Sequence, residues 1–212
     1  LKGLLRAHGT LAKGDAVYDS ASREAWLVKL PRASLRLYGD GLYDQLVLLD
    51  ELVAEVELEM KREARRHQGY KLLKSVPGIG SIRAATLLAL LKTPHRFRSR
   101  AQLWAYAGLA VVTKSSADYA VRGGELVAVR RAQTRGLNRN GNRRLKAVLK
   151  QAAQDVAWRG AFRDEYKARI AKGQRWQNVL LTFARRIAAL CWTVWKTKEP
   201  YDPSRYRPVH QL

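Results

Sequence analysis

The longest regular hydrophobic pattern in the chain lies between residues 42 and 67. Its apolar positions alternate four and three residues apart, as in the heptad seam of a coiled coil. The seam consists of Leu42, Leu46, Leu49, Val53, Val56 and Met60. The pattern predicts one long helix from about Tyr43 to His67, separated from the preceding chain by Pro31 and a turn at residues 38–41. Two alternatives stay open: the seam packs in the core of its own chain, or it pairs two chains as a homo-oligomer.

Shorter elements are predicted after residue 70. Two helices flank Pro77-Gly78-Ile79-Gly80 and resemble a helix-hairpin-helix motif, in which N–H groups at the start of the second helix hold a phosphate. The alternative is an ordinary helix-turn-helix corner inside a core. Further helices are expected over 102–109, from the basic loop 134–144 through Trp158, over 162–171 and over 174–196. Residues 110–113 and 125–131 are expected to form a small β-hairpin. The fold class is therefore mostly α, a long helix or coiled coil followed by a helical domain.

Charge is divided unevenly along the chain. Residues 1–70 hold 11 Lys or Arg and 11 Asp or Glu, whereas residues 71–212 hold 29 and 7, so the second part carries the whole net charge of +22. We interpret residues 1–69 as a linker and long helix, 70–200 as a DNA-engaging domain and 201–212 as a tail. The partner is expected to be a polyanion. Lys74, Gly78, Gly80 and Arg83 are the first candidate phosphate contacts.

Other composition features narrow the classes of protein and site. No run approaches the roughly 18 apolar residues of a membrane span, so we expect no membrane partner. The single cysteine, Cys191, excludes an intramolecular disulfide and favours a reducing, cytoplasmic location. The carboxylates that follow the Pro77–Gly80 turn show no metal-binding spacing, and the four histidines are scattered along the chain. No metal site is therefore expected in this chain.

A nucleophilic hydroxyl is the remaining candidate for chemistry. Ser115 and Ser116 lie between a short apolar strand and a basic hairpin, where arginines could neutralise charge on a phosphate under attack. Two serines in a loop are, however, more often plain turn residues, so the residues alone favour that interpretation over catalysis.

Several ordered motifs resemble one known family. They are Val76-Pro77-Gly78-Ile79-Gly80, Phe97-Arg98-Ser99, Leu103-Trp104-Ala105-Tyr106-Ala107-Gly108-Leu109, Ser115-Ser116-Ala117-Asp118-Tyr119 and residues 137–146. Their succession is similar to the carboxy-terminal domain of the transposases of the IS110 family, which are related to Piv DNA invertases and include bridge-RNA-guided recombinases. The ordered motifs span about Leu72 to Ala153.

The resemblance implies a DNA recombinase that uses a serine nucleophile. Ser116 aligns with the serine of a Ser-Gly pair in many members, but Ala117 replaces the glycine here, so Ser115 remains a rival. The family's amino-terminal RuvC-like domain, with its four acidic residues and a divalent metal such as Mg²⁺, is expected upstream of this sequence, whose only methionine is Met60. This chain itself is expected to hold no cofactor.

The resemblance also adds candidate contacts to DNA. Asn142, Arg143 and Arg144 look like the family's Gly-Asn-basic helix start, and Lys114 and Arg139 flank the same region. A solvated basic face is the competing interpretation for these residues. The partners implied are DNA, a guide RNA in the bridge-RNA-guided members, and a second copy through the 42–67 helix. A non-catalytic nucleic-acid-binding module is the alternative function.

Overall fold

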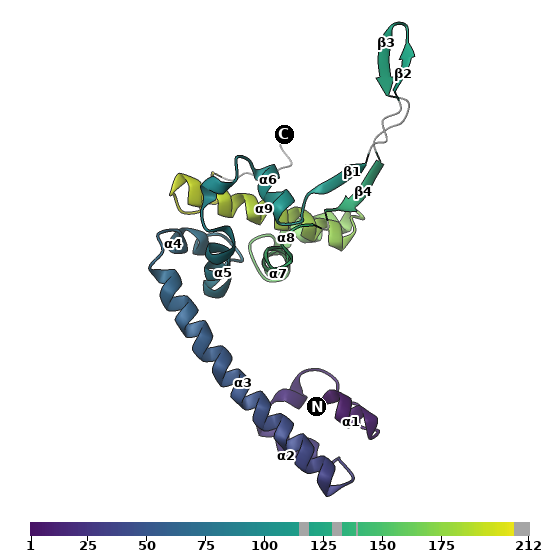
Figure 1. Ribbon diagram of the computed structural model, residues 1–212, viewed down its shortest axis with the longest axis vertical. Coiled ribbons are helices and arrows are strands. Elements are labelled where there is room, and N and C mark those ends of the chain that lie inside the picture. The colour runs from purple at the N-terminus through teal and green to yellow at the C-terminus, as the bar shows by residue number, and fades with distance from the viewer. Residues whose placement is uncertain (115–118, 129–132, 139, 206–212) are drawn as a thin grey trace. The chain divides into compact units, whose positions relative to one another are not determined.

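The computed structural model describes residues 1–114, 119–128, 133–138 and 140–205, and most of them are helical (Figure 1). The chain packs as two compact units, residues 1–60 and 61–212. The helices are α1 (Lys2–Ala7), α2 (Arg23–Leu27), α3 (Ala33–Arg65), α4 (Gly69–Lys74), α5 (Ser81–Leu91), α6 (Arg100–Tyr106), α7 (Arg143–Trp158), α8 (Arg163–Ala171) and α9 (Trp176–Thr197). The strands are β1 (Val111–Lys114), β2 (Tyr119–Arg122), β3 (Glu125–Ala128) and β4 (Gln133–Leu137). The functional boundary that the sequence predicts near residue 70 stays a prediction.

The long helix predicted from the heptad pattern is confirmed, but its predicted start is wrong. Helix α3 begins at Ala33 and passes through residues 38–41, where we expected a turn. Arg23 pairs with Asp40 at 2.5 Å and with Asp44 at 2.8 Å, and the Tyr43 hydroxyl donates to the Val17 carbonyl oxygen at 2.8 Å. These contacts outweigh the cost of roughly 1 kcal/mol for each glycine in a helix.

A small hydrophobic core holds the first unit together. Leu5, Ala12, Val17 and Leu30 are buried, and Trp26, Leu27 and Leu35 pack partly against them. A Cβ at Gly39 would lie 2.7 Å from Leu27 Cδ2, so the glycine lets the preceding segment pack closely on α3. The core of this unit therefore uses the start of α3.

Further along α3 the heptad seam is exposed. Leu49, Val53 and Val56 are 58%, 56% and 66% exposed, and Leu42, Leu46 and Met60 are half-buried. The interpretation in which the seam packs in the core of its own chain is therefore wrong for its central positions. Pairing with a second chain stays a prediction.

In the second unit, α7 and α9 form the centre of the core (Figure 1). Leu145, Leu149 and Val156 of α7 are buried, as are Phe183 and Ile187 of α9. Helices α4, α6 and α8 pack on α9, and α5 packs on α7. The predicted helices in this region are confirmed within a few residues, because their apolar faces follow the helical period.

Antiparallel strands are present, but their pairing differs from the prediction. We expected residues 110–113 to pair with 125–131, whereas β1 pairs with β4 and β3 pairs with β2. The β2–β3 hairpin closes through Gly123 and Gly124, whose φ angles are +62° and +87°. Two successive positive φ values are the geometry of a two-residue hairpin turn. Within the described residues, no helix is long and apolar enough to cross a bilayer.

Candidate nucleic-acid interface

The turn between α4 and α5 lies directly on α7. Gly78 has a φ of +80°, and a Cβ at this position would lie 2.8 Å from both the Ala152 carbonyl oxygen and Val156 Cγ1. Gly78 is therefore required for the close packing of the turn on the helix. Gly80, by contrast, has open space around it and precedes α5, whose amino end has no side-chain cap. The space beside Gly80 is accessible to a phosphate, whereas Gly78 packs against α7.

Arg83 holds this turn in place. Its Nη1 donates to the Gly78 carbonyl oxygen at 2.9 Å and to the Asp155 carboxylate of α7. The Arg83 side chain is only 25% exposed, while Asp155 is 56% exposed. Arg83 thus has a scaffold contact, and its predicted contact with DNA stays a prediction.

Lys74 lies in a basic pocket on α4. The pocket has a volume of about 520 Å³ and is lined by Arg65, Tyr70, Lys71, Lys74 and Ser75. Three of these five side chains are cationic and none is a carboxylate. Lys74 Nζ lies 5.5 Å from the centroid of the Tyr70 ring. The pocket therefore offers positive charge to an anion, and the phosphate contact at Lys74 stays a prediction.

The start of α7 is built from a contact between two glycines. A Cβ at Gly141 would lie 2.2 Å from the Gly108 nitrogen and 2.3 Å from its Cα, so the two backbones touch. Asn142 follows, and its backbone N–H donates to the Tyr106 carbonyl oxygen at 2.7 Å. Its Oδ1 accepts from the Leu145 N–H at 2.9 Å, which makes Asn142 the N-cap of α7.

The Asn142 side chain is thus used for the scaffold, while the two residues that follow it are free to meet solvent. Arg143 and Arg144 are both exposed. Among the predicted contacts, the structure places Gly78 and Arg83 together against α7 and Asn142 against Tyr106 of α6. Lys74 belongs to the separate pocket on α4.

The predicted nucleophiles cannot be placed in this geometry. Ser115, Ser116 and Arg139 lie outside the described residues. The backbone of Lys114 ends β1 and pairs with Gln133 of β4. In sequence, Ser115 follows β1 directly.

The approach to β1 is fixed by α9. Arg185 donates from Nε and Nη2 to the Leu109 carbonyl oxygen at 2.8 and 2.6 Å, and Trp104 Nε1 donates to the Arg185 carbonyl oxygen at 2.9 Å. Burial lowers the pKa of Arg185. These three contacts tie α6 and Leu109, which lies two residues before β1, to α9.

A cavity of about 590 Å³ between α6, α8 and α9 is part of the same scaffold. In its wall, the Glu165 carboxylate accepts from Arg169 at 2.9 Å and from Arg186 at 2.7 Å. Arg186 also lies 4.3 Å from the centroid of the Phe162 ring. The two arginines share this one carboxylate, and Arg100 and Arg185 also line the cavity, so its lining carries four cations against one carboxylate.

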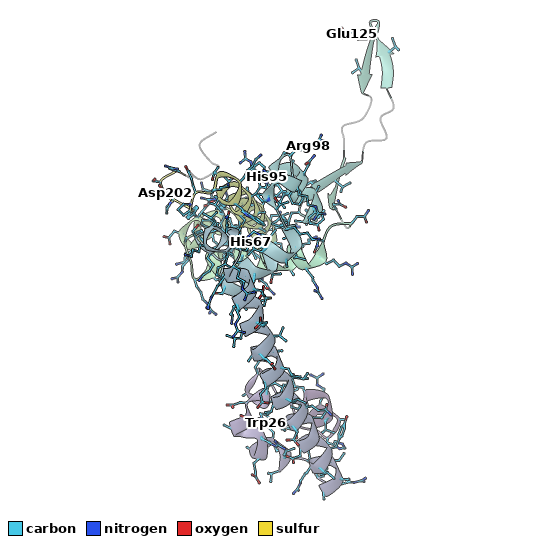
Figure 2. The ribbon with its side chains drawn as sticks, turned by 60° about the vertical axis from the view of Figure 1, so that its left-hand side comes forward. Trp26, His67, His95, Arg98, Glu125 and Asp202 are labelled. Atoms are coloured by element: carbon cyan, nitrogen blue, oxygen red, sulfur yellow. The ribbon has the colours of Figure 1, made fainter. Side chains whose placement is uncertain are left out.

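Sequence reasoning missed a group of residues beside Asn142. The Arg96 guanidinium lies 4.5 Å from the Tyr106 ring centroid, and Asn142 Nδ2 lies 3.5 Å from the Tyr106 hydroxyl. Figure 2 marks the basic segment between α5 and α6 by His95 and Arg98. Its run of cations was visible in the sequence, but the partner tyrosine, ten residues further on, was not.

Metal ligands are not grouped in the described part of the chain. Across residues 1–114, 119–128, 133–138 and 140–205, no three His, Cys, Asp or Glu side chains are close enough to hold an ion. Figure 2 shows His67 and His95 on different segments.

Comparison with known proteins identifies the kind of protein that the second unit resembles. Residues 70–167 match the sequence model described as Transposase IS116/IS110/IS902 family. The chain is 26% identical over 164 residues to an insertion element IS116 protein of Streptomyces clavuligerus, covering 77% of this chain and 38% of that protein. It is 25% identical over 218 residues to the transposase for insertion sequence element IS1111A of Coxiella burnetii, covering 95% and 54%.

A third relative is an insertion element IS110 protein of Streptomyces coelicolor, 29% identical over 183 residues, covering 83% of this chain and 41% of that protein. The chain thus spans between 38% and 54% of the length of these relatives. The matches show that the chain is similar to proteins of IS116, IS110 and IS1111A insertion elements, the last of which is named a transposase.

Proposed function

We propose that this chain is the DNA-engaging, carboxy-terminal part of a transposase of the IS116/IS110/IS902 family. In this proposal it supports strand cleavage and exchange of an insertion sequence through a serine nucleophile. The observation that carries the proposal is the contact of Gly108 with Gly141. This contact joins the two motifs that flank the Ser115–Ser116 segment, and both lie inside the region that matches the family.

The charge distribution supports DNA as the substrate. Residues 71–212 hold 29 Lys or Arg against 7 Asp or Glu. Arg143 and Arg144 are exposed at the start of α7, next to the Gly108–Gly141 contact. Cations placed in this way neutralise phosphates and release counterions, which is the main source of affinity for duplex DNA.

The proposed chemistry is a transesterification. The Ser116 Oγ attacks the phosphorus of a DNA phosphodiester, the bond from phosphorus to one deoxyribose oxygen breaks, and a phosphoserine link forms. The serine proton ends on the released deoxyribose hydroxyl, so no atoms are left over. Arginines near the reacting phosphate stabilise charge that develops on its non-bridging oxygens. Ser115 is the rival nucleophile.

A divalent metal would be held outside this chain. The resemblance implies that the carboxylates of a RuvC-like domain in the complete protein would hold this metal. The metal would activate the attacking and leaving oxygens. We assign no metal ligand to the residues of this chain.

We further propose that α3 pairs two copies of the chain. The seam positions Leu49, Val53 and Val56 are exposed and keep heptad spacing, which suits a coiled coil. Val53→Glu should convert a dimer to a monomer in light scattering. Val47→Glu, on an exposed position off the seam, should leave the dimer intact. A wild-type monomer at micromolar concentration contradicts the pairing.

DNA engagement is tested by the salt dependence of binding to a DNA duplex. We expect affinity to fall steeply as salt rises, and the double variant Arg143→Gln/Arg144→Gln to reduce the slope by about 1.8, at roughly 0.9 for each phosphate. Lys13→Gln, an exposed cation in the first unit, is the matched control and should leave the slope unchanged. A flat salt dependence of the wild type contradicts the proposal. An RNA of equal length in a parallel series shows whether a guide RNA uses the same surface.

The serine is tested in the complete transposase. Ser116→Ala should abolish strand cleavage while DNA binding is kept, and Ser115→Ala should still cleave. If both variants cleave like the wild type, the chain is a nucleic-acid-binding module without a serine nucleophile, which is the alternative function.

A further inference from the structure

The chain leaves α5 through a strained turn at Lys92. Its φ and ψ are 62° and −49°, and the Thr93 N–H donates to the Leu91 carbonyl oxygen at 2.7 Å. This is a γ-turn of the rare kind, which costs on the order of 1–3 kcal/mol in a residue with a side chain. The contacts that follow must therefore hold the segment in place.

The segment after Lys92 is anchored on α9. Trp192 Nε1 donates to the Pro94 carbonyl oxygen at 3.0 Å, and Pro94 is buried. The short 3₁₀ helix Pro94–Arg96 is fixed in this way. Phe97 comes next and is buried, with its ring centroid 5.4 Å from that of Tyr106. The backbone that carries Arg96 is thus held on both sides.

Arg96 lies over the Tyr106 ring and reaches its hydroxyl. The guanidinium carbon is 4.5 Å from the ring centroid, and Nη1 donates to the Tyr106 hydroxyl oxygen at 3.4 Å. Asn142 Nδ2 donates to the same oxygen at 3.5 Å. Because the oxygen accepts both hydrogen bonds, the hydroxyl proton of Tyr106 remains available to donate to a further acceptor.

The charge around this hydroxyl is positive. The hydrogen bond from Asn142 lowers the pKa of Tyr106, and the hydrogen bond from Arg96 and the charges of Arg96 and Lys92 act in the same direction against burial. Lys92 and Arg96 are both exposed. Among the ion pairs of the described residues, none compensates either cation with a carboxylate.

We propose that Lys92, Arg96 and Tyr106 form a binding site for one phosphate of the DNA backbone. Tyr106 donates its hydroxyl proton in a hydrogen bond to a non-bridging oxygen, while Arg96 and Lys92 supply positive charge. The site rests on the proposed function, because it takes its phosphate from the DNA substrate. It combines two cations with a neutral hydroxyl donor, whose oxygen already accepts hydrogen bonds from Arg96 and Asn142.

The position of this site suggests what the bound phosphate does. Tyr106 is the last residue of α6, and its carbonyl oxygen accepts from the Asn142 N–H at 2.7 Å. The chain continues from Tyr106 through Gly108 into β1, which Ser115 follows in sequence. A phosphate at this site therefore holds the DNA backbone at the end of α6, from which the chain leads through β1 to the proposed nucleophile.

The test measures duplex binding by the full chain over a series of salt concentrations. Tyr106→Phe removes only the hydroxyl and should weaken binding about threefold to tenfold without changing the salt slope, since no charge is lost. Arg96→Gln should weaken binding about tenfold and reduce the slope by about 0.9. Lys13→Gln, an exposed cation in the first unit, and Tyr166→Phe, on α8, are the matched controls and should bind like the wild type.

Equal thermal midpoints for all four variants exclude a folding defect as the cause. If wild-type binding is steeply salt-dependent but Tyr106→Phe and Arg96→Gln bind like the wild type, this site is wrong and the proposed function stands. Loss of the salt slope in Tyr106→Phe also overturns the site, because a neutral donor carries no counterion. If the wild type itself binds without salt dependence, the proposed function fails as well.

Discussion

The backbone of Gly141 touches the backbone of Gly108, with the Gly108 nitrogen 2.2 Å from the point where a Cβ on Gly141 would stand. A real Cβ cannot approach a backbone atom so closely. The contact brings the end of α6 to the start of α7, although 32 residues of chain separate the two glycines. It is therefore the packing on which the candidate interface depends.

Gly141→Ala should destabilise the second unit. The added methyl group meets backbone, which cannot rotate away, so we expect a loss of about 3 kcal/mol in the free energy of unfolding, the upper part of the range for overpacking. Gly41→Ala is the control, since nothing lies within 4 Å of its Cβ position in α3. It should be neutral or stabilising by up to about 1 kcal/mol. Chemical denaturation measures both, and equal stability of Gly141→Ala and the wild type contradicts the packing.

Arg83 and Asp155 should be coupled. The pair joins the α4–α5 turn to α7, and Arg83 also donates to the Gly78 carbonyl oxygen. A double-mutant cycle with Arg83→Gln and Asp155→Asn should give about 0.5–1 kcal/mol, because Asp155 is more than half exposed and solvent screens the pair. The coupling should fall in 1 M salt. No coupling at low salt argues against this contact.

Replacing Glu165 should reduce the free energy of unfolding far more than replacing its sequence neighbour Asp164. Its carboxylate accepts from Arg169 and Arg186, whose side chains are only 11% and 13% exposed. Glu165→Ala leaves both buried charges without a carboxylate partner, and we expect a loss of about 3 kcal/mol. Asp164→Ala, at an exposed position in the first turn of α8, should cost about 0.5 kcal/mol. Similar losses in the two variants contradict the network.

Cys191 should be unreactive in the folded protein. Burial in the core raises the pKa of its thiol to about 12, well above its ordinary value of 9.0. The thiolate is the reactive form, so a thiol reagent at pH 8 should label the folded chain very slowly. Unfolding in denaturant should release one fast-reacting thiol, which serves as the control. Rapid labelling of the folded chain means that Cys191 is accessible.

Local patterns were sufficient to predict several helices of the second unit. Helix α7 ends at Trp158 as predicted, because its apolar face repeats with the helical period and Asn142 caps its start. The α4 and α5 helices flank the predicted turn because Pro77 and Gly78 interrupt the pattern. In each case the information lies within a few residues of the element.

The features that the sequence did not predict depend on distant contacts. Helix α3 continues through Gly39 because Leu27 and Arg23 pack against it, which no local pattern near residue 39 reveals. The alternation of apolar and polar residues predicted strands but not their partners. We therefore predicted that β1 pairs with β3, whereas it pairs with β4.

The candidate site shows the same division. Arg143 and Arg144 were recognisable as exposed cations at a helix start. Tyr106 was not, because its role comes from Arg96 and Asn142, which approach it only after α6 and α7 have packed. Gly78 was predicted to contact phosphate, but its conformation serves its packing on α7.

The most direct test of the serine mechanism is to locate the covalent link in the complete transposase. A trapped protein–DNA adduct is digested with nuclease and trypsin, and the peptide covering residues 115–122, bounded by Lys114 and Arg122, is fragmented in a mass spectrometer. This peptide contains Ser115, Ser116 and Tyr119, which fragmentation distinguishes. The proposal predicts a nucleotide on Ser116, and its loss in Ser116→Ala. A nucleotide on Tyr119 or on a residue outside this peptide would contradict the account.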